Sequence, residues 1–375
     1  MNTKKKNNTT PKNLALTGGY AIGEALRQIN PDVMAVYPIT PQTPIISSFS
    51  KYVADGKAET KMIEVESEHS AMSACIGASA SGARTMTASS SQGIMYMMEV
   101  IPIAAAMRLP IVMTVANRAI SGTINIHNDH SDAMAMRDFG WVQFFAETVQ
   151  EAYDDIFIAL KIAEKANLPV APNLDGFFIT HSVENLELLD DRVVKKFIGE
   201  YQPKQSLFDF DKPVTFGALT LQDSYMEIRQ ELDKAMSKVP NIFKEVTKEF
   251  AEISGRKYDV LEEYKTEDAE KVIVVLGSTA GTIKDAIDGM RDQGEKVGLV
   301  KVKLFRPFPY KEVGKALKNV EEIIVMDKNL AIGAKQVLEG DVVQSVGSNE
   351  KVRSIVYGLG GRDVFVKDIE EMVRS

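Results

Sequence analysis

The sequence has 375 residues, and 44 Lys and Arg against 52 Asp and Glu give a net charge of −8. This length suits about two domains, and 45% hydrophobic residues allow large buried cores, so a disordered or collagen-like chain is excluded. The acidic balance argues against a nucleic-acid-binding surface, and no run of about 18 apolar residues is present to span a membrane. Residues 1–13 are polar and lack the apolar stretch of a signal peptide, so we expect a disordered tail and a cytoplasmic protein.

Cysteine and histidine are scarce. Cys75 is the only cysteine, and the chain has four histidines. One thiol can form neither an intramolecular disulfide nor a four-thiolate iron–sulfur site. Any redox centre must therefore belong to a cofactor or to another chain, and we predict no metal site in this one.

Short apolar runs alternate with helix-period segments through the first part of the chain. This alternation is typical of βαβ units, which build a parallel sheet with helices on both faces. Ligands of such sheets bind at the carboxyl ends of the strands, so we expect function in the turns that follow strands. The predicted strands are 33–37, 62–63, 85–87, 111–115 and 168–171, and the predicted helices are 45–53, 70–80, 95–107 and 152–166.

A second alternating block predicts a second α/β domain. Residues 201–264, which begin with prolines and continue into a charged helical run at 224–250, are expected to connect the two blocks. The turn at residues 277–281 carries only part of a dinucleotide-binding fingerprint and is weak evidence for a nicotinamide site. The predicted strands are 272–276, 297–302, 323–326 and 355–357, and the predicted helices are 282–293, 310–317 and 364–373.

The turn after the first predicted strand is rich in proline. Residues 37–44 read Y-P-I-T-P-Q-T-P, with a proline at every third position. Each proline fixes its own φ and moves the preceding residue out of the α region, so Thr40 lies on a stiff turn. We expect its hydroxyl to be held for a ligand. The alternative is a rigid turn in which Thr40 only caps the following helix.

A series of glutamates follows the second predicted strand. Glu64, Glu66 and Glu68 alternate, and a small-residue helix begins directly after them. Glu68 falls at the strand-to-helix turn, where an active-site carboxylate belongs. The alternative is that all three are exposed, as most glutamates are.

Small hydroxyl residues and a glycine occupy the next strand-to-helix turn. Residues 85–93 read T-M-T-A-S-S-S-Q-G and include Ser90 and Gln92. Such residues let a helix N-terminus approach a ligand closely, although a tight crossover turn explains them almost as well. The Met-rich helix expected at 94–107, which contains Pro102, is interpreted as core.

Arg118 follows the strand at 111–115. An arginine at the carboxyl end of a strand can bind a substrate carboxylate with two parallel hydrogen bonds, and the alternative is an ion pair with a loop aspartate. The loop after it could suggest a metal, but it lacks a regular ligand spacing. Its candidate ligands are His127, Asp129, His130 and Asp132.

Taken together, these motifs closely resemble one family, the pyruvate:ferredoxin oxidoreductases, in the form whose alpha subunit is a separate chain. The resemblance runs from about residue 14 to residue 375 in one collinear order. The matching stretches are Y-P-I-T-P at 37–41, Ser67-Glu68, T-A-S-S-S-Q-G at 87–93, N-R-A-I at 117–120, I-N-I at 124–126, D-H-S-D at 129–132, D-G-F at 175–177 and F-R-P-F-P at 305–309.

The resemblance implies an α/β fold with two domains. Residues 14–252 would form a thiamine pyrimidine-binding-type domain with C-terminal connecting helices, and residues 253–375 a second, transketolase C-terminal-like domain. It also implies the activity, which is oxidative decarboxylation of pyruvate to acetyl-CoA and CO2, reversibly, with electrons passed through iron–sulfur clusters to ferredoxin.

The resemblance also assigns roles to residues. Glu68 matches the glutamate that hydrogen-bonds the aminopyrimidine of thiamine diphosphate, and Arg118 matches the arginine that holds the substrate carboxylate. Thr40 matches the threonine beside the substrate. Ser90 and Gln92 are candidate cofactor contacts.

The family's Gly-Asp-Gly motif, which holds the diphosphate through Mg²⁺, does not occur here, since Gly340-Asp341 is followed by Val342. We therefore expect the diphosphate and Mg²⁺ on a partner chain, and the iron–sulfur clusters on partner chains only. The expected partners are beta, gamma and delta subunits, with ferredoxin reached through the complex, and pyruvate and coenzyme A as small molecules.

Three alternatives remain at this point. The sequence around Arg118 resembles both pyruvate and branched-chain members, so 2-oxoisovalerate is an alternative substrate. A non-catalytic scaffold subunit is a second alternative, and a nicotinamide-dependent dehydrogenase that uses the 277–281 turn is a third.

Overall fold

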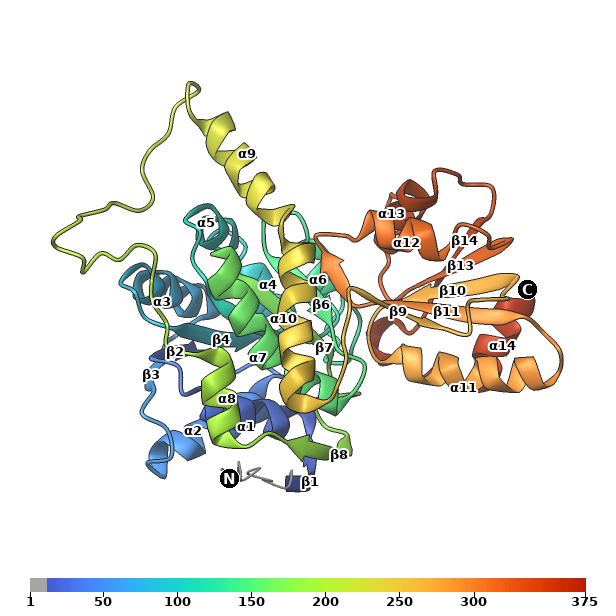
Figure 1. Ribbon diagram of the computed structural model, residues 1–375, viewed down its shortest axis with the longest axis horizontal. Helices are drawn as coiled ribbons and strands as arrows, with labels where there is room; N and C mark the ends of the chain where they lie inside the picture. The colour runs from blue at the N-terminus through green and yellow to red at the C-terminus, as the bar shows by residue number, and fades with distance from the viewer. Residues whose placement is uncertain (1–11) are drawn as a thin grey trace, which may run out of the picture.

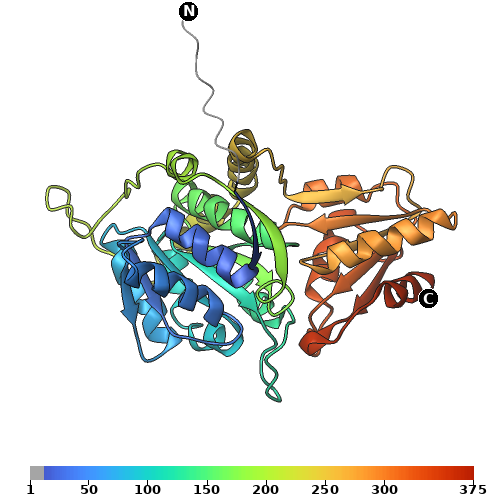
Figure 2. The same cartoon turned by 90° about the horizontal axis from the view of Figure 1, so that it is seen from below.

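The computed structural model describes residues 12–375, and two α/β domains lie side by side in it (Figures 1 and 2). The N-terminal domain ends with α10, and the C-terminal domain begins with β9. The strands of the N-terminal domain are β1 (Lys12–Thr17), β2 (Val33–Val36), β3 (Lys61–Glu64), β4 (Thr85–Ser89), β5 (Val112–Asn117), β6 (Val142–Phe145), β7 (Val170–Asp175) and β8 (Val183–Leu188). Its helices are α1 (Gly18–Ile29), α2 (Thr43–Ala54), α3 (Glu68–Ala80), α4 (Ser91–Tyr96), α5 (Ile101–Ala106), α6 (Ser131–Ala135), α7 (Val149–Ala166), α8 (Asp191–Ile198), α9 (Tyr225–Met236) and α10 (Val239–Ser254).

The C-terminal domain repeats the alternation on a smaller scale. Its strands are β9 (Leu261–Tyr264), β10 (Lys271–Val275), β11 (Val297–Val302), β12 (Leu304–Arg306), β13 (Glu322–Asp327) and β14 (Val352–Val356). Its helices are α11 (Thr279–Asp292), α12 (Tyr310–Ala316), α13 (Val337–Val346) and α14 (Val366–Arg374), with a short 3₁₀ turn at Leu359–Gly361.

The large sheet has the order β12-β6-β7-β5-β4-β2-β3, and all of its pairs are parallel except β12 with β6. Its central strands β4, β5 and β7 are buried along their whole length, as expected for strands covered by helices on both faces. The smaller sheet has the order β14-β13-β10-β11-β9, in which only β9 is antiparallel. The predicted α/β class with parallel sheets is confirmed.

Several elements differ from the prediction. The Met-rich segment forms two short helices, because Pro102 lies in the first turn of α5, where its missing N–H is tolerated, and could not continue α4. Residues 12 and 13, which the sequence analysis assigned to the polar tail, begin strand β1. They pair with Leu188 and Glu187 of β8, because the antiparallel ladder that contains Leu14 and Leu16 continues to them. The rest of that tail, residues 1–11, lies outside the described residues.

The predicted domain boundary at 252 falls two residues before the end of α10.

One strand crosses between the domains. β12 belongs by sequence to the second block, yet it pairs with β6 at the edge of the large sheet, where Leu304 lies opposite Phe144. The sequence analysis predicted neither strand. The C-terminal domain is therefore joined to the N-terminal domain through backbone hydrogen bonds as well as side chains.

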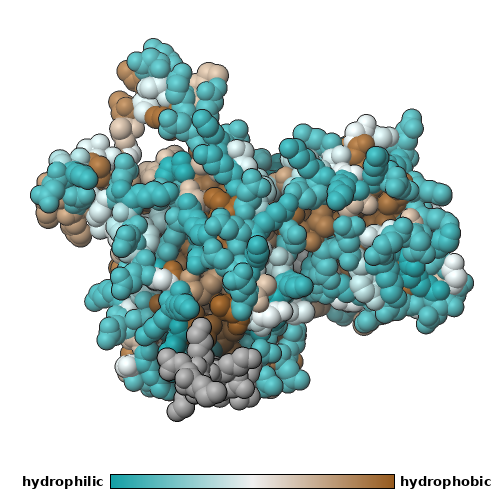
Figure 3. All heavy atoms as spheres, viewed as in Figure 1, coloured by the Kyte–Doolittle hydropathy of each residue, from teal (hydrophilic) through white to brown (hydrophobic). Residues whose placement is uncertain are grey.

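The surface is mostly hydrophilic on the face that Figure 3 shows, with hydrophobic side chains in small separate patches. The segment between α8 and α9 extends away from the body of the N-terminal domain (Figure 1) and exposes several large apolar side chains. Among the described helices, none is both long enough and apolar enough to cross a lipid bilayer.

Buried charges join the two domains at α7 and β11. Lys303 is 2% exposed, and its Nζ lies 3.0 Å from Glu151 Oε2 and 2.9 Å from Asp155 Oδ2. Glu151 also pairs with Lys301, at 2.9 Å. Each of these charges would be costly to bury alone, so the groups stabilise the interface only as a set.

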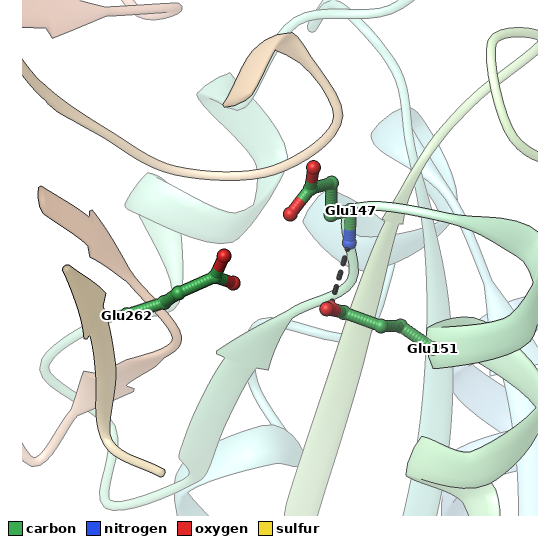
Figure 4. Close-up of side chains that lie close together, drawn as sticks. All are labelled: Glu147, Glu151 and Glu262. Atoms are coloured by element: carbon green, nitrogen blue, oxygen red, sulfur yellow. Dashed lines mark hydrogen bonds between the residues drawn. The ribbon is translucent and has the colours of Figure 1, made fainter. Parts of the chain in front are cut away.

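Three glutamates of this region lie close enough together to suggest a metal site (Figure 4): Glu147, Glu151 and Glu262. The ammonium groups of Lys301 and Lys284 already pair with them, Lys301 with all three and Lys284 with Glu147 and Glu262. The group is therefore part of the ion-pair network between the domains.

Replacing Lys303 with methionine should lower the free energy of unfolding by about 3–5 kcal/mol, because Glu151 and Asp155 would be left with too little positive charge in the interior. Urea denaturation followed by circular dichroism measures this. The control is Lys296→Met, which breaks a pair with Glu270 in which both side chains are 53% exposed and should cost less than about 1 kcal/mol. Equal losses for the two variants would contradict the structural role of the buried cluster.

Candidate active site

The five predicted site residues lie at the carboxyl ends of four adjacent parallel strands. In the order β5-β4-β2-β3, Arg118 follows β5, Ser90 and Gln92 follow β4, Thr40 follows β2, and Glu68 follows β3. Parallel strands end at the same edge of a sheet, so the topology brings these residues to one edge. That edge is the candidate active site.

The proline-rich turn after β2 is fixed to the neighbouring strand by Gln42. This fully buried side chain donates from Nε2 to the carbonyl of Ala88 at 2.9 Å, and its Oε1 accepts from the N–H of Ile39 at 3.4 Å. Helix α2 has Gln42 as its N-cap residue, so Thr40 does not cap the helix. The carbonyl of Thr40 accepts a hydrogen bond from Nη1 of Arg118 at 2.9 Å, and the threonine as a whole is exposed. These hydrogen bonds connect the turn to the ends of β4 and β5.

Glu68 is the first residue of α3, and Ser67 caps the helix by accepting the N–H of Ser70 at 3.2 Å. The glutamate is only 7% exposed, so the expectation of an exposed glutamate does not hold at this position. Burial raises the pKa of its carboxyl, partly opposed by a hydrogen bond from its own backbone N–H. No side chain of residues 13–375 donates a hydrogen bond to this carboxylate.

Gly93 leaves room for Glu68. A Cβ at this position would lie 2.8 Å from Glu68 Oε1 and 2.4 Å from Ser89 Oγ, so a side chain here would displace both. Ser89 is fully buried, and its hydroxyl has no hydrogen-bond partner within the described residues. A buried carboxylate and a buried free hydroxyl therefore face the same glycine, an arrangement that a polar ligand could complete.

Ser90 and Gln92 lie close to Gly93 in the chain, and their side chains form hydrogen bonds with other segments of the protein. The hydroxyl of Ser90 donates to the carbonyl of Ala116 at 2.6 Å, which ties the end of β4 to β5. Gln92 is exposed, and its Oε1 accepts the N–H of Ser121 at 2.8 Å. Both contacts are within the chain, and a role of either residue in cofactor binding stays a prediction.

Asp132 connects the turn after β4 with the end of β5. It is completely buried, and its carboxylate accepts from the N–H of Ser91 at 2.9 Å, the N–H of Arg118 at 3.0 Å and the amide of Asn117 at 2.9 Å. Burial raises the pKa of Asp132 to about 6, although these hydrogen bonds oppose the rise. Ser91 has a φ of 45°, an unfavourable conformation that this hydrogen bond helps to hold.

Arg118 is 6% exposed, and its guanidinium is held by two backbone carbonyls. Nε donates to the carbonyl of Asn125 at 3.0 Å and Nη1 to that of Thr40 at 2.9 Å. It forms no ion pair with a carboxylate of the described residues, so the alternative of an ion pair with a loop aspartate does not hold, and Asp132 of this loop binds the backbone N–H of Arg118 instead. Burial lowers the pKa of Arg118, with Asp132 opposing the change. Three of its five side-chain N–H groups remain for a ligand.

The histidines of the following loop both contact other side chains of the protein. His130 Nε2 lies 2.8 Å from Asp175 Oδ1, and His127 packs on Phe177 with ring centroids 5.0 Å apart. Asp175 also accepts from Lys328 at 2.8 Å and from the backbone N–H of Ser278 at 3.2 Å. The Asp175 carboxylate therefore occupies the N-terminal end of α11, in the turn considered for a nicotinamide.

Sequence reasoning missed two groups that shape the site. Gln42 and Ser89 stood within the quoted motifs, but nothing in the sequence indicates that they are buried or what they contact. Asp132 was named as a candidate metal ligand and within the D-H-S-D stretch, but not as the residue that binds Arg118. Its spacing of 14 residues from Arg118 gives no sign of the hydrogen bond between them, because an irregular loop separates the two.

Comparisons with known proteins identify the family. Residues 24–248 match the family model described as pyruvate flavodoxin/ferredoxin oxidoreductase, thiamine diphosphate-binding, and residues 269–369 match pyruvate:ferredoxin oxidoreductase core domain II. The chain is 51% identical to a pyruvate synthase subunit PorA of Thermotoga maritima, covering 94% of this chain and 91% of that one. It is 45% identical to the PorA subunit of Methanocaldococcus jannaschii, covering 96% and 93%. A ketoisovalerate oxidoreductase subunit VorA of Pyrococcus abyssi is 39% identical, covering 97% and 93%.

Two solved structures share the fold. A 2-oxoglutarate:ferredoxin oxidoreductase from Magnetococcus marinus superposes with a TM-score of 0.76 at 18% identity, covering 97% of this chain, which spans 65% of that one. A split-gene transketolase superposes with a TM-score of 0.56 at 13% identity, covering 96% and 98%. The expected architecture, a thiamine-type domain followed by a transketolase C-terminal-like domain, is confirmed. With both family models matched in order along its length, the chain belongs to the pyruvate:ferredoxin oxidoreductase family.

Proposed function

We propose that this chain is the alpha subunit of a pyruvate synthase, which oxidises pyruvate to acetyl-CoA and CO2 and passes the electrons to ferredoxin, reversibly. The observation that carries the proposal is that two side chains with unused hydrogen-bonding capacity lie at the same edge of the sheet: Arg118 after β5, with three N–H groups free, and Glu68 after β3, with a buried carboxylate. The PorA relatives are more similar than the VorA relative, at 51% against 39% identity, which favours pyruvate over a branched-chain 2-oxo acid.

The residues around Glu68 fit the pyrimidine ring of thiamine diphosphate. Gly93 leaves space beside the carboxylate of Glu68, which offers an acceptor to a flat polar ring, and the hydroxyl of Ser89, which also lies against Gly93, is buried without a hydrogen-bond partner among the described residues. When bound, thiamine diphosphate supplies a carbanion that adds to the 2-oxo group and takes up electrons after decarboxylation.

Glu68 would accept a hydrogen bond from a ring nitrogen of the pyrimidine and hold a proton there. Its raised pKa suits this role, because a carboxyl that gives and takes a proton works best when its pKa is nearer the working pH. We assign the diphosphate and its Mg²⁺ to a partner chain, since the Gly-Asp-Gly sequence is missing here.

Arg118 would bind the carboxylate of pyruvate, using the N–H groups that the two carbonyls leave free. The carbonyl of Thr40 fixes the guanidinium on one side, so the threonine contributes through its backbone as well as through the hydroxyl we place beside the substrate. We infer that the electrons leave through iron–sulfur clusters on partner subunits, which the family's beta and delta subunits would supply, because a single buried cysteine, Cys75, cannot hold a cluster.

Replacing Glu68 with glutamine should reduce kcat by about 100-fold or more while the subunits still assemble, because the amide cannot exchange a proton with the pyrimidine. Pyruvate-dependent viologen reduction by the co-expressed complex measures kcat, and gel filtration checks assembly. The control is Glu64→Gln, an exposed residue at the end of β3, which should leave kcat unchanged. Full activity of the Glu68→Gln complex would rule out the proposed role.

Replacing Arg118 with lysine should raise KM for pyruvate by about 10- to 100-fold, because one ammonium group cannot bind two backbone carbonyls and a carboxylate with the same geometry. Steady-state kinetics of the complex measures KM.

The matched control for this variant is Arg108→Lys. Arg108 also donates to two backbone carbonyls, those of Ala166 and Asn167, both at 2.9 Å, but it lies before β5 and not after it. We expect the KM for pyruvate of the Arg108→Lys complex to equal that of the wild type. Similar increases for the two variants would indicate a general loss of structure and not loss of a substrate contact.

A further inference from the structure

The loop that follows Arg118 has little structure of its own. Residues 119–130, which we call the 119–130 loop, contain no helix or strand, and Ile124 at its centre is 83% exposed. Within the loop, the N–H of Ala119 donates to the carbonyl of His127 at 3.0 Å, and the N–H of His127 donates to the side chain of Asn125 at 2.7 Å. Two such bonds do not determine the course of 12 residues, five of which are exposed, so the loop needs support from other segments.

The N-terminal domain supports the start of the loop, where Ser131 Oγ accepts the N–H of Ile120 at 2.9 Å and Gln92 Oε1 accepts that of Ser121 at 2.8 Å. The C-terminal domain supports the rest. Residues 358–362, which we call the 358–362 turn, lie against the loop at two points. The side-chain amide of Asn125 donates to the carbonyl of Gly360 at 3.1 Å, and the N–H of Gly361 donates to the carbonyl of Asn128 at 2.7 Å.

The two glycines fit the loop without space for a side chain. Gly360 and Gly361 have φ values of 59° and 78°, which favour glycine. A Cβ on Gly361 would lie 2.4 Å from the Cβ of His127, and one on Gly360 would lie 2.4 Å from the amide nitrogen of Asn125. A Cβ close to the main chain cannot move away as the end of a flexible side chain can, so position 361 is the more demanding of the two.

Asn125 transmits this contact to the arginine. Its backbone carbonyl accepts from Nε of Arg118 at 3.0 Å, while its side chain binds Gly360. One residue therefore touches the guanidinium with its main chain and the C-terminal domain with its side chain. A shift of the turn would move the carbonyl that orients Arg118.

Buried charges fix the turn in place. Lys328, at the end of β13, pairs with Asp175 of the N-terminal domain at 2.8 Å, and its carbonyl accepts the N–H of His130 at 2.8 Å. The same lysine lies under the turn, since a Cβ on Gly358 would be 3.5 Å from its Cε. The 119–130 loop is thus held at its end by Lys328 and at its middle by the glycines.

We propose that the 358–362 turn of the C-terminal domain positions Arg118 for substrate, with Gly360, Gly361 and Asn125 as positioning residues. This assigns the C-terminal domain a part in substrate binding although it supplies no group that touches substrate. The inference rests on the proposed function, in which Arg118 binds the carboxylate of a 2-oxo acid.

The test is Gly361→Ala in the assembled complex. We expect KM for pyruvate to rise roughly tenfold or more with a smaller change in kcat, because the guanidinium is misplaced while the cofactor contacts are intact. Hydrogen–deuterium exchange of peptides that cover residues 118–130 should become faster in the same complex, and this readout does not depend on activity.

The matched control is Gly347→Ala. Gly347 also lies in the C-terminal domain with a φ of 69°, but a Cβ there would meet nothing within 4 Å, so this variant carries the backbone strain without the contact. Its KM and its loop exchange should equal those of the wild type. Asn125→Ala, which removes the link and keeps the carbonyl, should resemble Gly361→Ala.

The outcomes separate this inference from the proposed function. An unchanged exchange rate in Gly361→Ala, or faster exchange with an unchanged KM, would overturn the positioning role. A wild-type complex that does not oxidise pyruvate would overturn the proposed function, and faster loop exchange in the variant would then still support the positioning of Arg118.

Discussion

Opposite charges buried between the two domains are the constraint on which the rest of the structure depends. Asp175 is completely buried, and although burial alone would raise the pKa of its carboxyl, Lys328 and His130 outweigh that effect and hold the pKa well below its usual range. Lys303 forms a second such contact with α7. Separating the domains would break these ion pairs and leave buried charges without partners. The C-terminal domain therefore keeps one position relative to the strand ends that carry Arg118 and Glu68.

Within the N-terminal domain, a single carboxylate organises the substrate side of the site. Asp132 binds the backbone of Ser91 and of Arg118, so the turn after β4 and the end of β5 are fixed relative to each other. The opposite side, around Glu68 and Ser89, is left with unpaired polar atoms. The carboxylate of Asp132 is thus fully used within the chain, whereas three N–H groups of Arg118 and the carboxylate of Glu68 are left for ligands, which is the arrangement expected when substrate and cofactor complete the site.

The sequence predicted the strand ends well because short apolar runs and small-residue helices are local patterns. Thr40, Glu68 and Arg118 all lie directly after predicted strands, and the topology brings these strands together. Two kinds of feature could not be predicted. Strand β12 pairs across the domains, and the contact of Asn125 with Gly360 joins residues 235 positions apart, so neither has a local signal. The family resemblance supplied the roles of the site residues, which spacing alone left open.

The most direct measurement of the account is the relative rate of two 2-oxo acids. The co-expressed complex, loaded with thiamine diphosphate and coenzyme A under anaerobic conditions, is compared for viologen reduction with pyruvate and with 2-oxoisovalerate. The account predicts a higher kcat/KM for pyruvate. Preference for 2-oxoisovalerate would keep the arrangement of Glu68 and Arg118 but contradict the substrate. No reduction with either acid, in a complex shown to contain thiamine diphosphate and iron–sulfur clusters, would contradict the central claim that this chain provides the substrate side of a pyruvate-oxidising site.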